Sequence, residues 1–302
     1  MKIVFMGTPD FAVASLDALV QANFNVVAVI TAPDKPAGRG QKINESAVKK
    51  YAVEKSIPVL QPEKLKNPEF LEQLKSYQAD LQVVVAFRML PEVVWNMPPK
   101  GTINLHGSLL PQYRGAAPIN HAIINGEKES GVTTFFLTHE IDTGAIIQSA
   151  SIPISDEETA GDLHDKLMHI GAGLLVQTVT AIEKGDYTEQ PQPQNDVLKH
   201  APKIFKDDCK INWNNSSQQI YNLIRGLSPY PTAFTLLNDK TLKIFKAELE
   251  DKEPAIVAGG FLTDGKTYLK FATKDGFIKL LDIQYEGKKR MLIEDFLRGM
   301  RL

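Results

Sequence analysis

The first 31 residues, "MKIVFMGTPDFAVASLDALVQANFNVVAVIT" (residues 1–31), contain the pattern that decides the fold. An apolar run at residues 2–7 ends in a glycine and is typical of a buried strand. Residues 10–22 place apolar side chains at helical spacing, and residues 25–31 form a second apolar run rich in β-branched residues. Strand, helix and strand joined by short loops predict a right-handed parallel β-α-β unit.

The same alternation continues as far as residue 87. Helices are predicted near residues 46–55 and 68–77, and strands at residues 57–60 and 81–87. Strands that read as continuous apolar runs between helices belong to parallel sheets that are covered on both faces. The predicted fold class is therefore α/β, with a mostly parallel, doubly wound, Rossmann-like sheet.

The pattern changes after the next predicted strand, at residues 102–107. Residues 117–126 predict a helix, and residues 131–138 and 144–154 predict two strands that face each other. A long helix is predicted from Thr159 to Gly185, because Asp162 lies in its first turn and a glycine follows its end. This α/β domain is expected to occupy residues 1–188.

A second, smaller domain is expected at residues 207–302. The preceding segment, residues 189–206, is rich in Pro, Gln and charge without periodicity, which is typical of a linker. The later residues read as short strands separated by hairpin or turn dipeptides, and these predict a small β-barrel, OB-like in shape. The dipeptides are Asn238-Asp239, Asp264-Gly265, Asp275-Gly276 and Glu286-Gly287.

Composition excludes several classes of protein. The chain has 302 residues, of which 43% are hydrophobic and 23% charged, as in a globular protein. The single cysteine, Cys209, excludes an intramolecular disulfide and a cysteine-rich metal site. No apolar run is long enough to span a bilayer, and the first run meets Gly7 too early for a signal peptide. We therefore expect a cytoplasmic protein with no membrane contact. A monomer is also expected, although nothing in the composition determines the oligomeric state.

Charge is distributed unevenly along the chain. The net charge is −2, but from Lys203 onward there are 17 Lys and Arg residues against 13 Asp and Glu residues. The first 202 residues have 17 basic and 23 acidic residues. A mildly basic C-terminal domain is compatible with a polyanionic partner, and equally with a solvated surface.

The segment "INLHGSLLPQYRGAAP" (residues 103–118) places chemical groups close together. On a strand, Asn104 and His106 point to the same face. His can take and return a proton near neutral pH, and an Asn amide can stabilise an oxygen that gains charge, worth roughly 3 kcal/mol in other enzymes. Asp142, in the turn "DTG", is the best candidate to orient the imidazole. From spacing alone, a structural histidine and two ordinary turns explain these residues better than a catalytic site does.

The longer segment "INLHGSLLPQYRGAAPI" (residues 103–119) resembles the signature of the 10-formyltetrahydrofolate-dependent formyltransferases. The resemblance implies a catalytic trio of Asn104, His106 and Asp142, and 10-formyltetrahydrofolate as co-substrate without a metal. It also implies a folate site between two loops. The residues expected to line it are Phe87, Arg88, Met89, Leu90, Ser108, Leu109, Leu110 and Pro111. Arg88 stands where many members of the family have glycine.

Further features resemble those members that formylate the methionine of initiator methionyl-tRNA in support of translation initiation. These are the opening "MGTPDFAVASL" (residues 6–16), the basic insertion "TAPDKPAGRGQK" (residues 31–42) and the second domain. The likeness implies that Lys35, Arg39 and Lys42 contact the tRNA. From charge alone, basic residues of the C-terminal domain are expected to hold the tRNA backbone, namely Lys203, Lys206, Lys210 and Arg290.

Three other interpretations stay open on the sequence. Glycinamide ribonucleotide formyltransferases lack the insertion and the second domain, whereas sugar-nucleotide formyltransferases share the trio but act on amino sugars. A non-catalytic nucleotide- or RNA-binding α/β protein is the alternative from another class. No GxGxxG or P-loop motif supports nucleotide binding.

Overall fold

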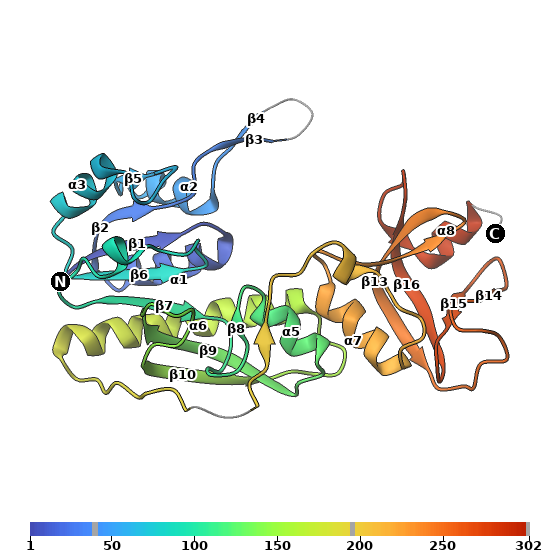
Figure 1. The fold of residues 1–302 in the computed structure, drawn as a ribbon. Helices are drawn as coiled ribbons and strands as arrows, with labels where there is room; N and C mark the ends of the chain where they lie inside the picture. The colour runs from blue at the N-terminus through green and yellow to red at the C-terminus, as the bar shows by residue number, and fades with distance from the viewer. Residues whose placement is uncertain (38–41, 194–196, 300–302) are drawn as a thin grey trace. The chain divides into compact units, whose positions relative to one another are not determined.

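The computed structural model describes residues 1–37, 42–193 and 197–299 (Figure 1). The chain forms two compact units, and each unit is built from three separate stretches of the sequence. Unit 1 comprises Met1–Gly115, Gly131–Ile152 and His164–Lys199; unit 2 comprises Ala116–Ser130, Pro153–Leu163 and His200–Leu302. These units are defined by contacts in space and not by consecutive ranges of sequence. The predicted domain limits, residues 1–188, 189–206 and 207–302, therefore stay a prediction.

Unit 1 is built on a seven-stranded sheet with the spatial order β10-β9-β7-β6-β1-β2-β5. The pairs β1–β2, β1–β6, β2–β5 and β6–β7 are parallel, whereas β9 runs antiparallel to β7. The strands are β1 (Lys2–Gly7), β2 (Asn25–Ile30), β5 (Val59–Leu60), β6 (Leu81–Val85), β7 (Thr102–His106), β9 (Glu129–Phe136) and β10 (Ile146–Pro153). The predicted mostly parallel α/β sheet is confirmed.

Helices pack along this sheet (Figure 1). They are α1 (Asp10–Gln21), α2 (Ala47–Glu54), α3 (Pro68–Ser76), α4 (Glu92–Trp95) and α6 (Ala160–Lys184). The central strands are buried as predicted, with Ile3 to Met6 and Val83 fully inaccessible. A Cβ on Gly171 of α6 would lie 3.0 Å from Leu105, so α6 packs closely against β7 and fixes the strand that presents the candidate site.

Unit 2 contains an antiparallel sheet with the order β12-β13-β16-β15-β14, and β17 pairs with β16. Its strands are β12 (Ala233–Leu237), β13 (Lys240–Glu250), β14 (Phe261–Thr263), β15 (Leu269–Ala272), β16 (Phe277–Tyr285) and β17 (Met291–Leu292). The predicted turn dipeptides all fall between consecutive strands, and Asn238 and Asp239 both have the positive φ that a tight hairpin turn requires. Among the described strands, β12 and β14 stand at the two ends of the order, so the domain is a half-barrel.

Helices complete unit 2. They are α5 (Pro118–Ile124), α7 (Ser217–Leu227) and α8 (Ile293–Arg298), with a short 3-10 helix at Asp207–Cys209. A capping box of Ser216 and Gln219 starts α7. The apolar faces of α7 and α8 join the buried core of the half-barrel through Ile220, Ile224 and Phe296. Two two-residue strands, β8 (Arg114–Gly115) and β11 (His200–Ala201), lie in the connecting segments.

The basic insertion differs from the surface loop that its composition favours. It forms a hairpin of β3 (Lys35–Ala37) and β4 (Lys42–Asn44), which projects from the sheet of unit 1 (Figure 1). Strands of three residues are too short to show periodicity, so the sequence carried no signal for them. No helix in the described part of the chain is long and apolar enough to cross a membrane.

Candidate active site

Strand β7 presents the first two candidate catalytic residues. Asn104 is opposite Val84 of β6 and Phe135 of β9, and His106 ends the strand opposite Thr133. The two side chains share one face of β7, as their spacing predicts. Asn104 is half-buried, and within the described residues its amide has no hydrogen-bond partner. The amide is therefore available to a ligand.

His106 is held from both sides of its ring. Its Nε2 lies 2.9 Å from the backbone oxygen of Tyr113, and its Nδ1 lies 3.8 Å from Oδ2 of Asp142. A carbonyl oxygen can only accept, so Nε2 carries a hydrogen and donates it to Tyr113. Nδ1 is thus the ring nitrogen that faces the carboxylate. The structure brings His106 and Asp142 together as predicted, at a separation longer than a hydrogen bond.

Asp142 lies in a turn fastened at several points. Its φ is 55°, a left-handed conformation that Asp tolerates. Its Oδ2 accepts a hydrogen bond of 2.9 Å from the backbone nitrogen of Gly115. The side-chain amide of Gln192 donates to the backbone oxygens of Asp142 and Gly144, at 2.8 and 2.9 Å. The carboxylate is thereby aimed at His106 before any substrate binds.

Sequence reasoning missed these supporting residues. Gln192 lies 50 residues beyond Asp142 in the predicted linker, and Arg114 donates two hydrogen bonds to its side-chain oxygen. The Tyr113 contact uses a backbone carbonyl, which carries no side-chain signature. The one signal in the sequence was that Arg114 lies in the segment that resembles the family signature, residues 103–119.

The residues expected to line the folate site lie on two loops at the carboxyl ends of β6 and β7. Met89 is 74% exposed, whereas the side chains of Leu90, Ser108 and Leu110 are buried. The Ser108 hydroxyl donates to the backbone oxygen of Gln112 at 2.7 Å. The Leu110 backbone nitrogen donates to the Thr133 hydroxyl at 3.2 Å, and that hydroxyl donates to the Ser108 backbone oxygen at 2.7 Å, so these two backbone groups are already engaged.

Arg88 has a definite role in the loop after β6. Its guanidinium donates to the backbone oxygens of Pro62 and Glu63, which follow β5. In the sheet order, β1 and β2 stand between β6 and β5. The arginine therefore ties two loops together across the carboxyl edge of the sheet, something glycine at this position could not do.

The basic residues predicted to contact tRNA are only partly described. Lys35 is exposed on β3, Lys42 belongs to β4, and Arg39 lies outside the described residues. In unit 2, Lys203 is exposed and its ammonium lies 5.4 Å from the ring centre of Phe205. Arg290, in contrast, pairs with both carboxylate oxygens of Asp282 and stacks over Phe245. Its charge is thus already compensated.

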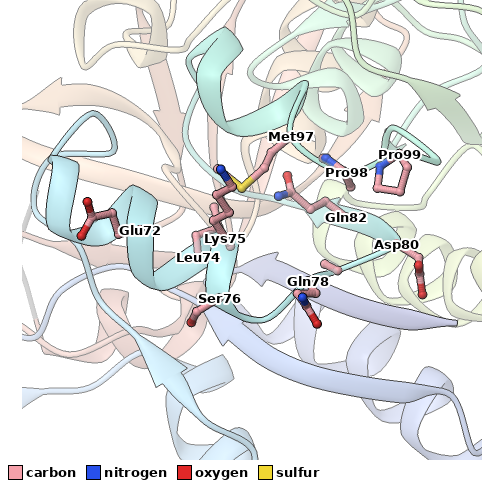
Figure 2. A pocket seen from close by; sticks show the side chains of 11 residues that line it. Glu72, Leu74, Lys75, Ser76, Gln78, Asp80, Gln82, Met97, Pro98 and Pro99 are labelled. Atoms are coloured by element: carbon pink, nitrogen blue, oxygen red, sulfur yellow. The ribbon is translucent and has the colours of Figure 1, made fainter.

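A hollow of about 650 Å³ lies elsewhere on unit 1 (Figure 2). Its lining includes Lys75, Asp80, Gln82 and Met97, which precede or begin β6 and β7. His106 ends β7, so this hollow is at the opposite edge of the sheet from the candidate site. Within residues 1–37, 42–193 and 197–299, no group of three or more His, Cys, Asp and Glu residues is arranged to hold a metal ion.

The arrangement suits transfer of an acyl group between two nitrogen atoms. An amide donor, an imidazole and a carboxylate occupy the carboxyl edge of a parallel sheet, where ligands bind in such folds. The amide can stabilise an oxyanion, and the imidazole can carry a proton. No covalent intermediate with the protein is required.

Comparison with known families supports this chemistry. Residues 1–179 match the model of the family described as formyl transferase, and residues 203–301 match the formyl transferase C-terminal domain. A sugar 3N-formyl transferase solved in the presence of dTDP and 5-N-formyl-THF has a TM-score of 0.69 at 24% identity, covering 96% of this chain and 99% of its own. That likeness shows the fold. The fold and the sequence matches define the class: this chain is a formyl transferase.

Curated relatives narrow the family further. The methionyl-tRNA formyltransferase of Bacteroides fragilis is 54% identical over 310 residues, covering 100% of this chain and 96% of the relative. That of Parabacteroides distasonis is 56% identical over 311 residues, with the same coverage. The chain belongs to the methionyl-tRNA formyltransferase family.

Proposed function

We propose that this protein transfers the formyl group of 10-formyltetrahydrofolate to the α-amino group of methionine on initiator methionyl-tRNA. The observation that carries the proposal is the placement of His106 against Asp142, with Asn104 on the same face of β7. Full-length identity above one half to methionyl-tRNA formyltransferases supports the choice of acceptor. In this proposal residues 1–188 carry the chemistry, residues 189–206 link the domains, and residues 207–302 bind tRNA.

The reaction begins with attack by an uncharged amine. Its nitrogen bonds to the formyl carbon, and the carbonyl oxygen becomes an oxyanion as the carbon becomes tetrahedral. The Asn104 amide, which has no partner among the described residues, would donate to that oxyanion. Because the negative charge exists only after attack, this hydrogen bond favours the transition state over the bound substrate.

One proton must then leave the attacking nitrogen while another reaches the departing folate nitrogen. The Nε2–H of His106 is committed to the Tyr113 carbonyl, so we assign proton transfer to Nδ1. The Asp142 carboxylate, 3.8 Å from Nδ1, would stabilise the imidazolium that forms. Collapse of the intermediate breaks the bond from the formyl carbon to the folate nitrogen, which takes up the proton, and leaves formylmethionyl-tRNA and tetrahydrofolate.

The co-substrate would lie between the loops Phe87–Leu90 and Ser108–Pro111. A pterin ring is flat and partly apolar. The first loop offers it two apolar side chains, the partly exposed Phe87 and the largely exposed Met89. The second loop would offer the partly exposed side chains of Leu109 and Pro111, because the Ser108 carbonyl and the Leu110 N–H are already bonded to Thr133.

Incubation of the protein with 10-formyltetrahydrofolate and methionyl-tRNA is expected to produce formylmethionine, detected after deacylation. Sugar nucleotides carrying a free amine and glycinamide ribonucleotide serve as competing acceptors in parallel reactions. Preferential formylation of one of these acceptors would contradict the proposal. Binding of tRNA without formyl transfer would instead support a non-catalytic RNA-binding role.

Binding of tRNA is expected to weaken with salt, because each neutralised phosphate releases counterions. With two or more phosphate contacts, a plot of log Kd against log salt should have a slope of at least about 1.4 to 1.8. Replacing exposed Lys203 by glutamine should reduce this slope by roughly 0.7 to 0.9. Exposed Lys100, in unit 1, provides the control substitution and should leave the slope unchanged. A flat titration of the unmodified protein would argue against phosphate contacts.

A further inference from the structure

Both ends of the projecting hairpin carry a carboxylate. Asp34 comes immediately before β3, and Glu45 comes immediately after β4. These two residues join the hairpin to the sheet and to α2, so they are called the feet of the hairpin here. Any force that fixes both feet also restricts how the hairpin as a whole is oriented.

One ammonium group contacts both feet. Nζ of Lys49 donates to Oδ2 of Asp34 and lies 2.8 Å from Oε1 of Glu45. Lys49 is on the first turn of α2, and its side chain is only 19% exposed. The lysine therefore closes the base of the hairpin with a single cation.

The contact with Asp34 extends into the sheet. The Gln61 amide donates to the other carboxylate oxygen of Asp34 at 2.8 Å and to the backbone oxygen of Ala32 at 2.9 Å. The hydrogen bond from Lys49, followed by that from Gln61, holds the pKa of Asp34 below its ordinary value. The hydrogen bond to Asp34, followed by that to Glu45, raises the pKa of Lys49. Both groups are therefore charged at neutral pH. The contact is lost as the pH falls through the lowered pKa of Asp34 or rises through the raised pKa of Lys49.

The helix that carries Lys49 is itself fixed at its start. Ser46 caps α2 by accepting from the backbone nitrogen of Lys49 at 3.0 Å. Its hydroxyl also lies 2.7 Å from the hydroxyl of Thr31, at the end of β2. Lys49 is therefore anchored on a helix whose position is set by the sheet. Isolated ion pairs on a surface contribute little to folding stability, but this network joins two ends of one insertion and so controls geometry.

We propose that Lys49 is a positioning residue, which holds both feet of the β3–β4 hairpin and so sets the hairpin's orientation toward the acceptor tRNA. The inference rests on the proposed function, since the hairpin matters only if the acceptor is tRNA. Loss of the ammonium would leave the catalytic trio intact. The hairpin would then sample orientations that do not support tRNA binding, which lowers apparent affinity in proportion to the competent fraction.

The test compares Lys49→Met with Lys49→Arg and with Lys50→Met, a control at an exposed lysine on the same helix. In Lys49→Met, KM for methionyl-tRNA should rise by roughly three- to tenfold, with kcat and KM for 10-formyltetrahydrofolate unchanged. Lys49→Arg should recover most of the loss, and Lys50→Met should behave like the unmodified protein. An equal rise in KM for both lysine-to-methionine variants, or no rise in either, would overturn the inference.

Two further measurements guard against a purely structural explanation. Asp34→Asn should raise KM for methionyl-tRNA and leave KM for 10-formyltetrahydrofolate unchanged. Combining it with Lys49→Met should cause little further change, because each substitution removes the same contact between Lys49 and Asp34. Hydrogen exchange of peptides spanning β3 and β4 should accelerate in Lys49→Met, while peptides from β1 and β2 stay protected. Unchanged exchange in the hairpin would contradict the inference even if KM rose. Failure of the proposed function is distinguishable, since the unmodified protein would then not formylate methionyl-tRNA at all.

Discussion

Replacement of His106 by alanine is expected to lower kcat for formylation by about a thousandfold, within the range that general acid–base catalysis contributes. The substitution removes the one imidazole that faces Asp142 within the described residues, and with it the group assigned to take the proton from the attacking amine. Binding of 10-formyltetrahydrofolate should change little, because the loops that would hold it are untouched. The measurement is steady-state formylation at saturating methionyl-tRNA, with folate binding measured separately.

The fold must survive for this result to be informative. His106 is 6% exposed and donates one hydrogen bond to Tyr113, so its loss should cost roughly 1 to 3 kcal/mol of unfolding free energy and leave the protein folded. His121→Ala is the matched control, since its Nε2 also contacts a backbone oxygen, that of Pro202, at 3.0 Å. His121 faces no carboxylate in the described structure. Turnover of His106→Ala within tenfold of the control would refute the catalytic role.

The arrangement of Asn104 and His106 could be predicted because it depends on local geometry. Alternate residues of a strand share a face, and continuous apolar runs between helices identified the parallel sheet that buries β7. The turn dipeptides of unit 2 were predictable for the same reason, since positive φ at Asn238 and Asp239 is a local preference. Asp142 needed the family resemblance, because nothing local distinguishes its turn from others.

The supporting contacts could not be predicted, because they join segments far apart in the chain. Gln192 reaches the Asp142 turn from a stretch whose composition indicated only a linker. Tyr113 contributes a backbone oxygen, and any residue type has one. Arg88 was recognised as a departure from the family pattern, but its bonds to Pro62 and Glu63 depend on the order of strands in space. These are consequences of tertiary structure that residue patterns do not encode.

Gly144→Ala is expected to reduce kcat by about a hundredfold through displacement of Asp142, since a misplacement of about 1 Å can have that effect. A Cβ at Gly144 would lie 1.7 Å from the backbone oxygen of Phe136, a distance at which the backbone must move. Phe136 belongs to β9, and its nitrogen donates to the backbone oxygen of Ala145 at 3.1 Å. The strand is fixed in the sheet, so the turn is the part that shifts, and Asp142 moves with it.

The matched control is Gly173→Ala in α6, where an added Cβ meets no atom within 4 Å. That substitution should leave turnover unchanged and stabilise α6 at this exposed position by about 0.8 to 1 kcal/mol. Gly144→Ala should lower unfolding free energy by about 1 to 3 kcal/mol, as overpacking does, while the protein stays folded at 25 °C. Turnover reports the displacement of Asp142, whereas thermal melting and folate binding show whether the variant is still folded. A folded Gly144→Ala variant with normal kcat would show that the position of Asp142 does not limit the reaction, and Asp142 would then have to be removed from the catalytic trio.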